Sequence, residues 1–124
     1  MIVEYVRYQI PAERREAFED AYATAQSALA ASPHCLAWEL SRCSEDPTQY
    51  TLRIEWDSSE GHLQGFRRSP EFGAFFAAVR PYVGDIQEMR HYELTAVRGR
   101  NQAAAVSAVS AGRQTSRLGI RRRL

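Results

Sequence analysis

The chain of 124 residues contains no lysine, so arginine supplies all sixteen basic side chains, and it has only two cysteines. Cys35 and Cys43 fall on one expected strand, eight residues apart, which corresponds to about 26 Å at about 3.3 Å per residue. A disulfide needs Cα atoms within about 7 Å of each other, so the sequence predicts two free thiols. Two cysteines without a CxxC pair also make a poor zinc site.

Long apolar runs and the common catalytic motifs are missing as well. No apolar run reaches the length of a membrane span, and the N-terminus lacks the basic and apolar regions of a signal peptide, so we expect a cytoplasmic protein. The sequence has no phosphate-binding glycine loop, no GxSxG, no HExxH and no dinucleotide fingerprint. These absences argue against nucleotide-dependent enzymes, hydrolases with a nucleophilic serine and zinc proteases.

Charge divides the chain into two parts. Residues 1–97 contain all fifteen acidic residues and nine arginines, whereas residues 98–124 contain seven arginines and no acid. We therefore expect one domain over residues 1–97, followed by a basic tail at 98–124 that is rich in Ala, Ser and Arg. The tail has no aromatic residue on which a base could stack, so contact with nucleic acid or with a membrane is not the expected role.

Apolar spacing predicts the order β-α-β-β-α-β, with a second helical region broken near Ser69-Pro70. This order is typical of a ferredoxin-like α+β fold, in which helices cover one face of a four-stranded antiparallel sheet. The expected strands span residues 2–10, 35–43, 50–57 and 85–94, and the first helix spans residues 11–31.

Strict alternation then assigns side chains to the two faces of each strand. It places Leu36, Trp38 and Leu40 together in the second strand, and in the last strand it groups Ile86, Tyr92 and Leu94 opposite Met89 and His91. The first strand likewise has apolar residues on both faces. Both faces of the sheet should therefore be covered, and a second copy of the chain is the natural cover for the face without helices.

The segment from Tyr50 to Phe76 combines an alternating strand that ends in Trp56, a broken helix, and a Ser69-x-x-Phe72 motif. In these features the chain resembles the antibiotic biosynthesis monooxygenase domain family over about residues 1–95. The resemblance implies a homodimer that forms a dimeric α+β barrel. It also implies oxygenase chemistry without metal or flavin, so no cofactor and no metal ion are expected.

One departure from the family concerns haem. The family often has His or Trp three residues before the serine, where this chain has Phe66. Haem-degrading relatives use an Asn, Trp and His set, and the matching positions here are the apolar Val6, Phe66 and Phe76. Haem oxygenation is therefore not expected.

Oxygenation without a cofactor needs a base, a group that holds an oxyanion, and an apolar pocket that excludes water. His91 is the candidate base, and Arg53 and Tyr82 are candidates for the oxyanion and ligand contacts. Each has an alternative. His91 also fits a structural position at the dimer seam, and Arg53 also fits an ion-pair ladder with Glu39 and Glu55.

The pocket should lie between the sheet and its helices, although aromatic residues there also fit a plain core. Whether His62 points inward is left open. The candidate pocket residues are Tyr22, Trp38, His62, Phe66, Phe72 and Phe76.

Two classes of function remain. The first is a cofactor-independent monooxygenase that oxidises a small phenol- or quinol-type aromatic with molecular oxygen. The second is a non-catalytic dimeric module that binds a small hydrophobic ligand or a partner; an isomerase or lyase is a weaker third option. If His62 and His91 face the cleft of the monomer the enzyme is favoured, and if they face the dimer seam or solvent the binding module is favoured.

Overall fold

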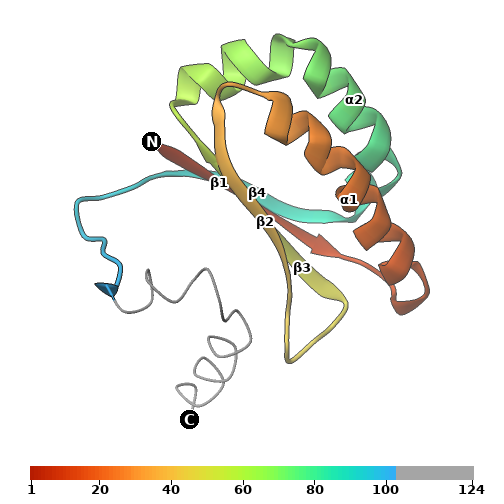
Figure 1. Cartoon of the computed structure of the whole chain (residues 1–124). Coiled ribbons are helices and arrows are strands. Elements are labelled where there is room, and N and C mark those ends of the chain that lie inside the picture. Colours follow the sequence, from red (N-terminus) through yellow and green to blue (C-terminus); the bar gives the residue numbers. More distant parts are fainter. Residues whose placement is uncertain (103–124) are drawn as a thin grey trace. The chain divides into compact units, whose positions relative to one another are not determined.

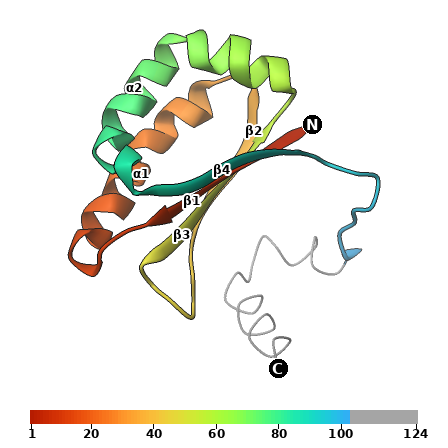
Figure 2. The ribbon, with the colours of Figure 1, turned by 180° about the vertical axis from the view of Figure 1, so that it is seen from behind.

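A computed structural model describes residues 1–102 of the chain. In this part, four strands form one layer and two α-helices form a second layer that packs against it. Figures 1 and 2 show both helices on the same side of the sheet. All neighbouring strands are antiparallel, in the order β2-β3-β1-β4. The ferredoxin-like fold is therefore confirmed. The elements are β1 (Ile2–Gln9), α1 (Arg15–Ala31), β2 (Cys35–Arg42), β3 (Gln49–Trp56), α2 (Pro70–Val79) and β4 (Ile86–Glu93).

The first compact unit of the chain spans Met1–Leu94, and the second spans Thr95–Leu124. Of the second unit only residues 95–102 are described, and there the Val97 N–H donates to Thr95 Oγ1 at 3.1 Å. The expected basic tail at 98–124 lies largely outside the described residues, so its role stays a prediction.

The core is centred on Phe18 of α1, which is fully buried. Its ring lies 4.8 to 5.3 Å, centroid to centroid, from four tyrosine rings on three other segments and on α1 itself. The partners are Tyr8 of β1, Tyr22 of α1, Tyr50 of β3 and Tyr82 after α2. Edge-to-face and tilted contacts of this kind stabilise beyond the apolar area that they bury.

β2 contains a bulge at Leu36, where one extra residue of this strand faces β3. A bulge changes which side chains share a face, because alternation is interrupted by one residue. Leu36 is therefore 50% exposed, whereas Cys35, Trp38 and Leu40 pack against the core. The prediction that Leu36 lies beside Trp38 and Leu40 was wrong for this reason. Both cysteines are free, as expected.

A second bulge interrupts β4. Arg7 of β1 pairs with Glu88, but the next residue, Tyr8, pairs with Ile86, so Gln87 is the extra residue. Ile86 consequently lies on the helix side of the sheet together with Met89 and His91, and all three line the same cavity. The predicted grouping of Ile86 with Tyr92 and Leu94 was wrong, because alternation cannot reveal where a strand gains a residue.

The break between the two helical pieces is confirmed at Ser69. A turn of π-helix (Gly61–Gly65) and a short 3-10 turn (Phe66–Arg68) come first, and Ser69 is then extended. The Ser69 hydroxyl donates to the Phe66 carbonyl at 2.6 Å and accepts from the Phe72 N–H at 3.4 Å. One side chain thus ends the first piece and caps the second.

The cap gives a first prediction. Ser69→Ala should lower the free energy of unfolding by about 1 kcal/mol, because it removes the side-chain cap and leaves the Phe72 N–H and the Phe66 carbonyl with only their backbone contacts to Ser69. Urea denaturation measures the change. Ser27→Ala, at an exposed position inside α1, is the matched control and should have no destabilising effect, since Ala is the better helix former. Equal effects of the two substitutions would contradict the capping role.

Candidate active site

A cavity of about 180 Å³ lies between the helix side of the sheet and α2. Its walls come from β1, β3, β4, both α-helices, the π- and 3-10 turns before α2 and the turn after it, and most of the side chains are apolar or aromatic. The apolar lining includes Val6, Leu52, Ile54, Phe66, Phe72, Phe75, Phe76 and Met89. Such a lining excludes water from whatever the cavity holds.

Three ionisable side chains meet on one wall of this cavity. Glu4 of β1 pairs in register with His91 of β4, so the two side chains are neighbours across the strands. His62 comes from the π-turn and stacks on the Trp56 ring, with 4.6 Å between centroids and 23° between planes. Glu4 Oε1 lies 3.5 Å from His62 Nε2, and Glu4 Oε2 lies 3.5 Å from His91 Nε2.

The Glu4 carboxyl is unusual because it is only 6% exposed. Burial raises its pKa, while the Trp56 indole N–H, which donates to Oε1 at 3.0 Å, and the charges of His91 and Arg67 act in the opposite direction. Burial thus makes ionisation of Glu4 less favourable than ionisation of an exposed carboxyl.

His62 is also buried, and burial lowers its pKa to about 4, with further lowering from the charges of His91 and Arg67. The imidazole is therefore neutral at pH 7. Its Nδ1 is buried and has no hydrogen-bond partner among the described residues. The favoured tautomer accordingly carries its proton on Nε2, facing Glu4. His91 is different, because 40% of its side chain is exposed.

A pair of tyrosines adds a neutral donor to the cavity. The hydroxyls of Tyr8 and Tyr22 lie 2.5 Å apart, and both residues line the cavity. Burial raises the pKa of each phenol, so both stay protonated. Only one hydroxyl hydrogen is used between the two, which leaves the other free to bind a ligand oxygen.

Of the nine site residues proposed from the sequence, six line the cavity. They are His91 and the pocket candidates Tyr22, His62, Phe66, Phe72 and Phe76. Val6, at the position compared with haem-degrading relatives, lines it as well. Whether they act on a substrate is not decided by their position alone.

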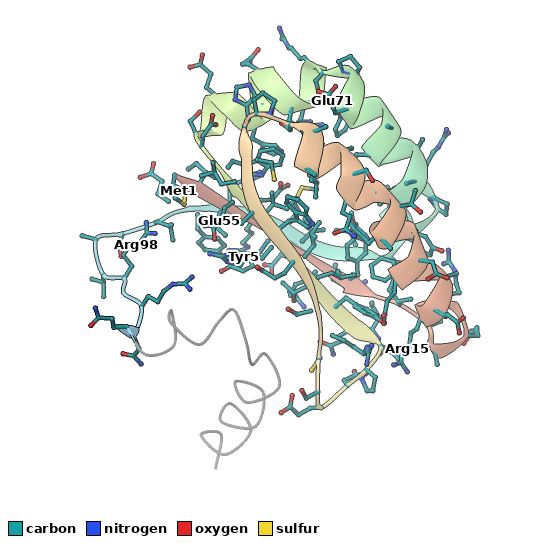
Figure 3. All side chains as sticks on the ribbon, in the orientation of Figure 1. Met1, Tyr5, Arg15, Glu55, Glu71 and Arg98 are labelled. Carbon is teal, nitrogen blue, oxygen red and sulfur yellow. The ribbon has the colours of Figure 1, made fainter. Side chains whose placement is uncertain are left out.

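Three other candidates lie elsewhere, beginning with Arg53, which is on the opposite face of the sheet. Its guanidinium contacts Glu55 at 2.6 Å, Glu39 at 3.5 Å and the Tyr5 hydroxyl at 3.3 Å. Figure 3 shows Tyr5 and Glu55 on the side of the sheet away from the helices. The structure therefore has the ion-pair ladder, and Arg53 is not placed to hold an oxyanion in the cavity.

Trp38 and Tyr82 also lie outside the cavity. The Trp38 indole N–H donates to Gln26 at 3.1 Å, and the ring lines a separate, more polar cleft between α1 and β2. Tyr82 is 7% exposed and packs beneath the Arg14 guanidinium, which is 4.7 Å from the ring centroid. Tyr82 belongs to the core around Phe18.

Sequence reasoning missed Glu4, although a signal for it existed. In the first strand the even-numbered positions Ile2, Val6, Tyr8 and Ile10 form the apolar face, and Glu4 falls within that series. An acidic residue on the inner face of a central strand is rare, because burying a carboxylate costs free energy unless a partner or a function retains it. The fold was predicted correctly, but this exception to the pattern was overlooked.

In the part of the chain that the structure describes, no helix combines the length and the apolar character that crossing a bilayer requires.

Comparison with known proteins identifies the family of this chain. The family model for antibiotic biosynthesis monooxygenases matches residues 1–78, and the chain belongs to this family. The match includes Glu4, Trp56, His62 and Phe66, whereas His91 lies beyond it.

Individual relatives are distant. The uncharacterised protein YczJ of Bacillus subtilis is 27% identical over 93 residues, which cover 75% of this chain and 98% of YczJ. Among solved structures, a Bordetella bronchiseptica protein that carries the name antibiotic biosynthesis monooxygenase has a TM-score of 0.62 at 24% identity. The match covers 76% of this chain and 96% of the Bordetella chain. A variant of SnoaB, a cofactor-independent oxygenase from Streptomyces nogalater, has a TM-score of 0.61 at 15% identity. The match covers 79% of this chain and 94% of the SnoaB chain. Likeness at these identities shows the fold.

The lowered pKa of His62 gives a second prediction. Between pH 6.5 and pH 4 the unfolded chain protonates this histidine, while the folded protein does not. The free energy of unfolding should therefore fall over this range, by up to about 3 kcal/mol from His62.

Urea denaturation of chelator-treated protein at pH 7 and pH 4.5 measures this fall. His62→Gln should lose less stability over the range, since glutamine does not titrate, whereas His34→Gln, outside the cavity, should follow the wild type. The same fall in His62→Gln as in the wild type would show that His62 is not buried as a neutral group.

Proposed function

We propose that this protein is a monooxygenase that uses molecular oxygen to oxidise a small, electron-rich aromatic of the phenol or quinol type, without metal or flavin. The observation that carries the proposal is the position of His62, His91 and Glu4 on the wall of an otherwise apolar cavity. Membership of the family and the name of the SnoaB neighbour support oxygenation without a cofactor.

His91 is the proposed base. It is the most exposed of the three polar groups, with 40% of its side chain accessible, so a substrate that enters the cavity can reach it. Its Nε2 lies 3.5 Å from Glu4 Oε2, so the Glu4 carboxyl lies beside the ring. An imidazole that the substrate hydroxyl can reach is the kind of group that general base catalysis uses.

The proposed reaction balances with one substrate and one oxygen molecule. His91 removes the hydroxyl proton of a phenol with a free para carbon, and the phenolate transfers an electron to oxygen. The resulting radical and superoxide combine to form a C–O bond at that carbon. The peroxide takes up the proton, the C–H proton is lost and the O–O bond breaks, which yields a quinone and water.

Two features of the cavity fit such a substrate. Its volume of about 180 Å³ is below the range of about 300–1,000 Å³ common for drug-sized ligands, so a substrate of one or two rings is proposed. The free hydroxyl hydrogen of the Tyr8–Tyr22 pair can bind the second oxygen of the substrate and stabilise charge that develops there. The tyrosine pair thus takes the part first considered for Arg53.

A ligand-binding module remains the second candidate, favoured by Val6, Phe66 and Phe76. These three positions, which carry polar residues in haem-degrading relatives by the sequence comparison, present only apolar surface to the cavity. A protein that only binds a hydrophobic ligand needs no more than this.

Oxygen consumption separates the two functions and gives a third prediction. Chelator-treated protein should consume oxygen with at least one member of a panel of anthrones, dihydroxynaphthalenes and catechols. His91→Ala should lower kcat by about 100-fold or more, the usual effect of losing a general base.

The matched control is His34→Ala, because His34 pairs with Asp57 at 3.0 Å outside the cavity; this variant should keep full activity. Full oxygen uptake in His91→Ala would exclude His91 as the base. Binding of the aromatics without any uptake would favour the ligand-binding module.

We also propose that the working form is a homodimer that joins the helix-free faces of two sheets. This face carries a shallow groove lined by Val3, Tyr5, Tyr92 and Leu94, among others. Tyr92 is 49% exposed and packs edge-on against Tyr5, with 5.5 Å between ring centroids. The face also carries ion pairs, including Arg7–Glu88 and Arg53–Glu55. Half-exposed aromatic and aliphatic side chains among such pairs are favourable for burial against a second copy.

The fourth prediction tests this dimer. Light scattering after size exclusion should give twice the chain mass for the wild type, and Tyr92→Glu should shift the protein toward the monomer because it buries a charge in the interface. Leu63→Glu changes a residue of similar exposure, 44%, on the π-turn, and should leave the dimer intact. A wild-type monomer, or dissociation by Leu63→Glu alone, would contradict this interface.

A further inference from the structure

We propose that Glu4, His62 and His91 form a binding site for a divalent first-row transition-metal ion. Two imidazole nitrogens and one carboxylate are a donor set that such ions prefer, with further positions left open for water or a ligand.

The geometry of the three donors fits one ion. One ligand atom from each side chain lies within 4.8 Å of the other two. Glu4 Oε1 lies 3.5 Å from His62 Nε2 and Glu4 Oε2 lies 3.5 Å from His91 Nε2, so each carboxylate oxygen is near one imidazole. Two donors at about 2.1 Å from a tetrahedral ion are about 3.4 Å apart, so the two imidazole nitrogens must approach each other, and His91 is exposed enough to turn. Binding through His62 Nε2 also moves the proton of that ring to Nδ1.

The surrounding residues orient the donors. Trp56 holds the Glu4 carboxylate through its indole N–H at 3.0 Å and stacks on the His62 ring. Contacts of this kind fix ligand orientation in metal sites. The cavity reaches all three donors, and His91, with 40% of its side chain exposed, lies where an ion can enter.

The contacts of the Glu4 carboxylate also favour a bound cation. Within residues 1–102, its Oε2 has only the 3.5 Å contact to His91, which is too long for a good hydrogen bond. A buried carboxylate with a single good donor gains from a cation placed on its unpaired oxygen. Arg67 lines the same cavity, and its positive charge opposes a bound cation and limits the affinity.

A bound ion would occupy the imidazole lone pair that the proposed oxygenation uses for the substrate proton, so the two uses of His91 exclude each other within one molecule. The inference does not rest on the proposed function, because metal binding can be measured without substrate. Failure of either one therefore leaves the other intact.

The test is a titration of the untagged full chain, first treated with chelator, with Co²⁺ and with Zn²⁺. Calorimetry should give one ion per chain, and Co²⁺ should develop a visible absorption band from nitrogen and oxygen ligands without the near-ultraviolet band of thiolate ligation. His91→Gln should weaken binding roughly tenfold or more, as should Glu4→Gln, which keeps an oxygen for the Trp56 N–H.

His34→Gln removes a histidine whose Nδ1 lies 3.0 Å from Asp57, and it is the control for binding at that surface pair. It should leave the stoichiometry and affinity unchanged. His91→Gln is the most direct test of the metal site, because a substitution at this exposed position leaves the buried core unchanged. Circular dichroism verifies that the variant is folded. No saturable binding, or binding lost in His34→Gln but kept in His91→Gln, would overturn the proposed site.

Discussion

The packing of α1 on the sheet through Phe18 is the interaction on which the rest of this structure depends. The ring contacts tyrosines from β1, from β3 and from the turn before β4, so one side chain joins three segments distant in sequence. Two of its partners, Tyr8 and Tyr22, also line the cavity. The rigid aromatic core therefore forms one wall of the site, and close packing there fixes the position of the neutral hydroxyl pair in that wall.

Burial of the Glu4 carboxyl among these apolar side chains lowers the stability of the folded protein. A carboxyl that is 6% exposed in an aromatic cavity lowers stability unless it is compensated, and the structure compensates it in part, through Trp56 and two histidines at longer range. Structural ion pairs are usually completed by close hydrogen bonds. In the described part of the chain, Glu4 Oε2 has only a 3.5 Å contact and His62 Nδ1 has no hydrogen-bond partner. Buried ionisable groups with shifted pKa values are typical of functional sites. The raised pKa of Glu4 and the lowered pKa of His62 give this wall of the cavity that character.

How much the sequence predicted depends on whether a feature is local. The order of elements and the break near Ser69-Pro70 follow from residue spacing along the chain, and both are confirmed. The two bulges depend on which residues of a neighbouring strand are paired, so alternation within β2 or β4 could not reveal them. Arg53 is a different case: the apolar series Tyr50, Leu52, Ile54 and Trp56 already placed it on the opposite face, and its choice as a site residue ignored this pattern.

The cavity has a polar centre although the positions compared with haem-degrading relatives are apolar in this chain. Val6 of β1, Phe66 of the 3-10 turn and Phe76 of α2 present apolar side chains to the cavity. β1, β4 and the π-turn supply Glu4, His91 and His62 instead. Strand positions hold side chains more rigidly than loops do, and the β4 bulge at Gln87 sets which residues of that strand face the cavity. Because the three groups come from separate segments and meet at one wall, their convergence is better explained by a shared chemical task, the transfer of a proton or the binding of an ion, than by the packing of a core.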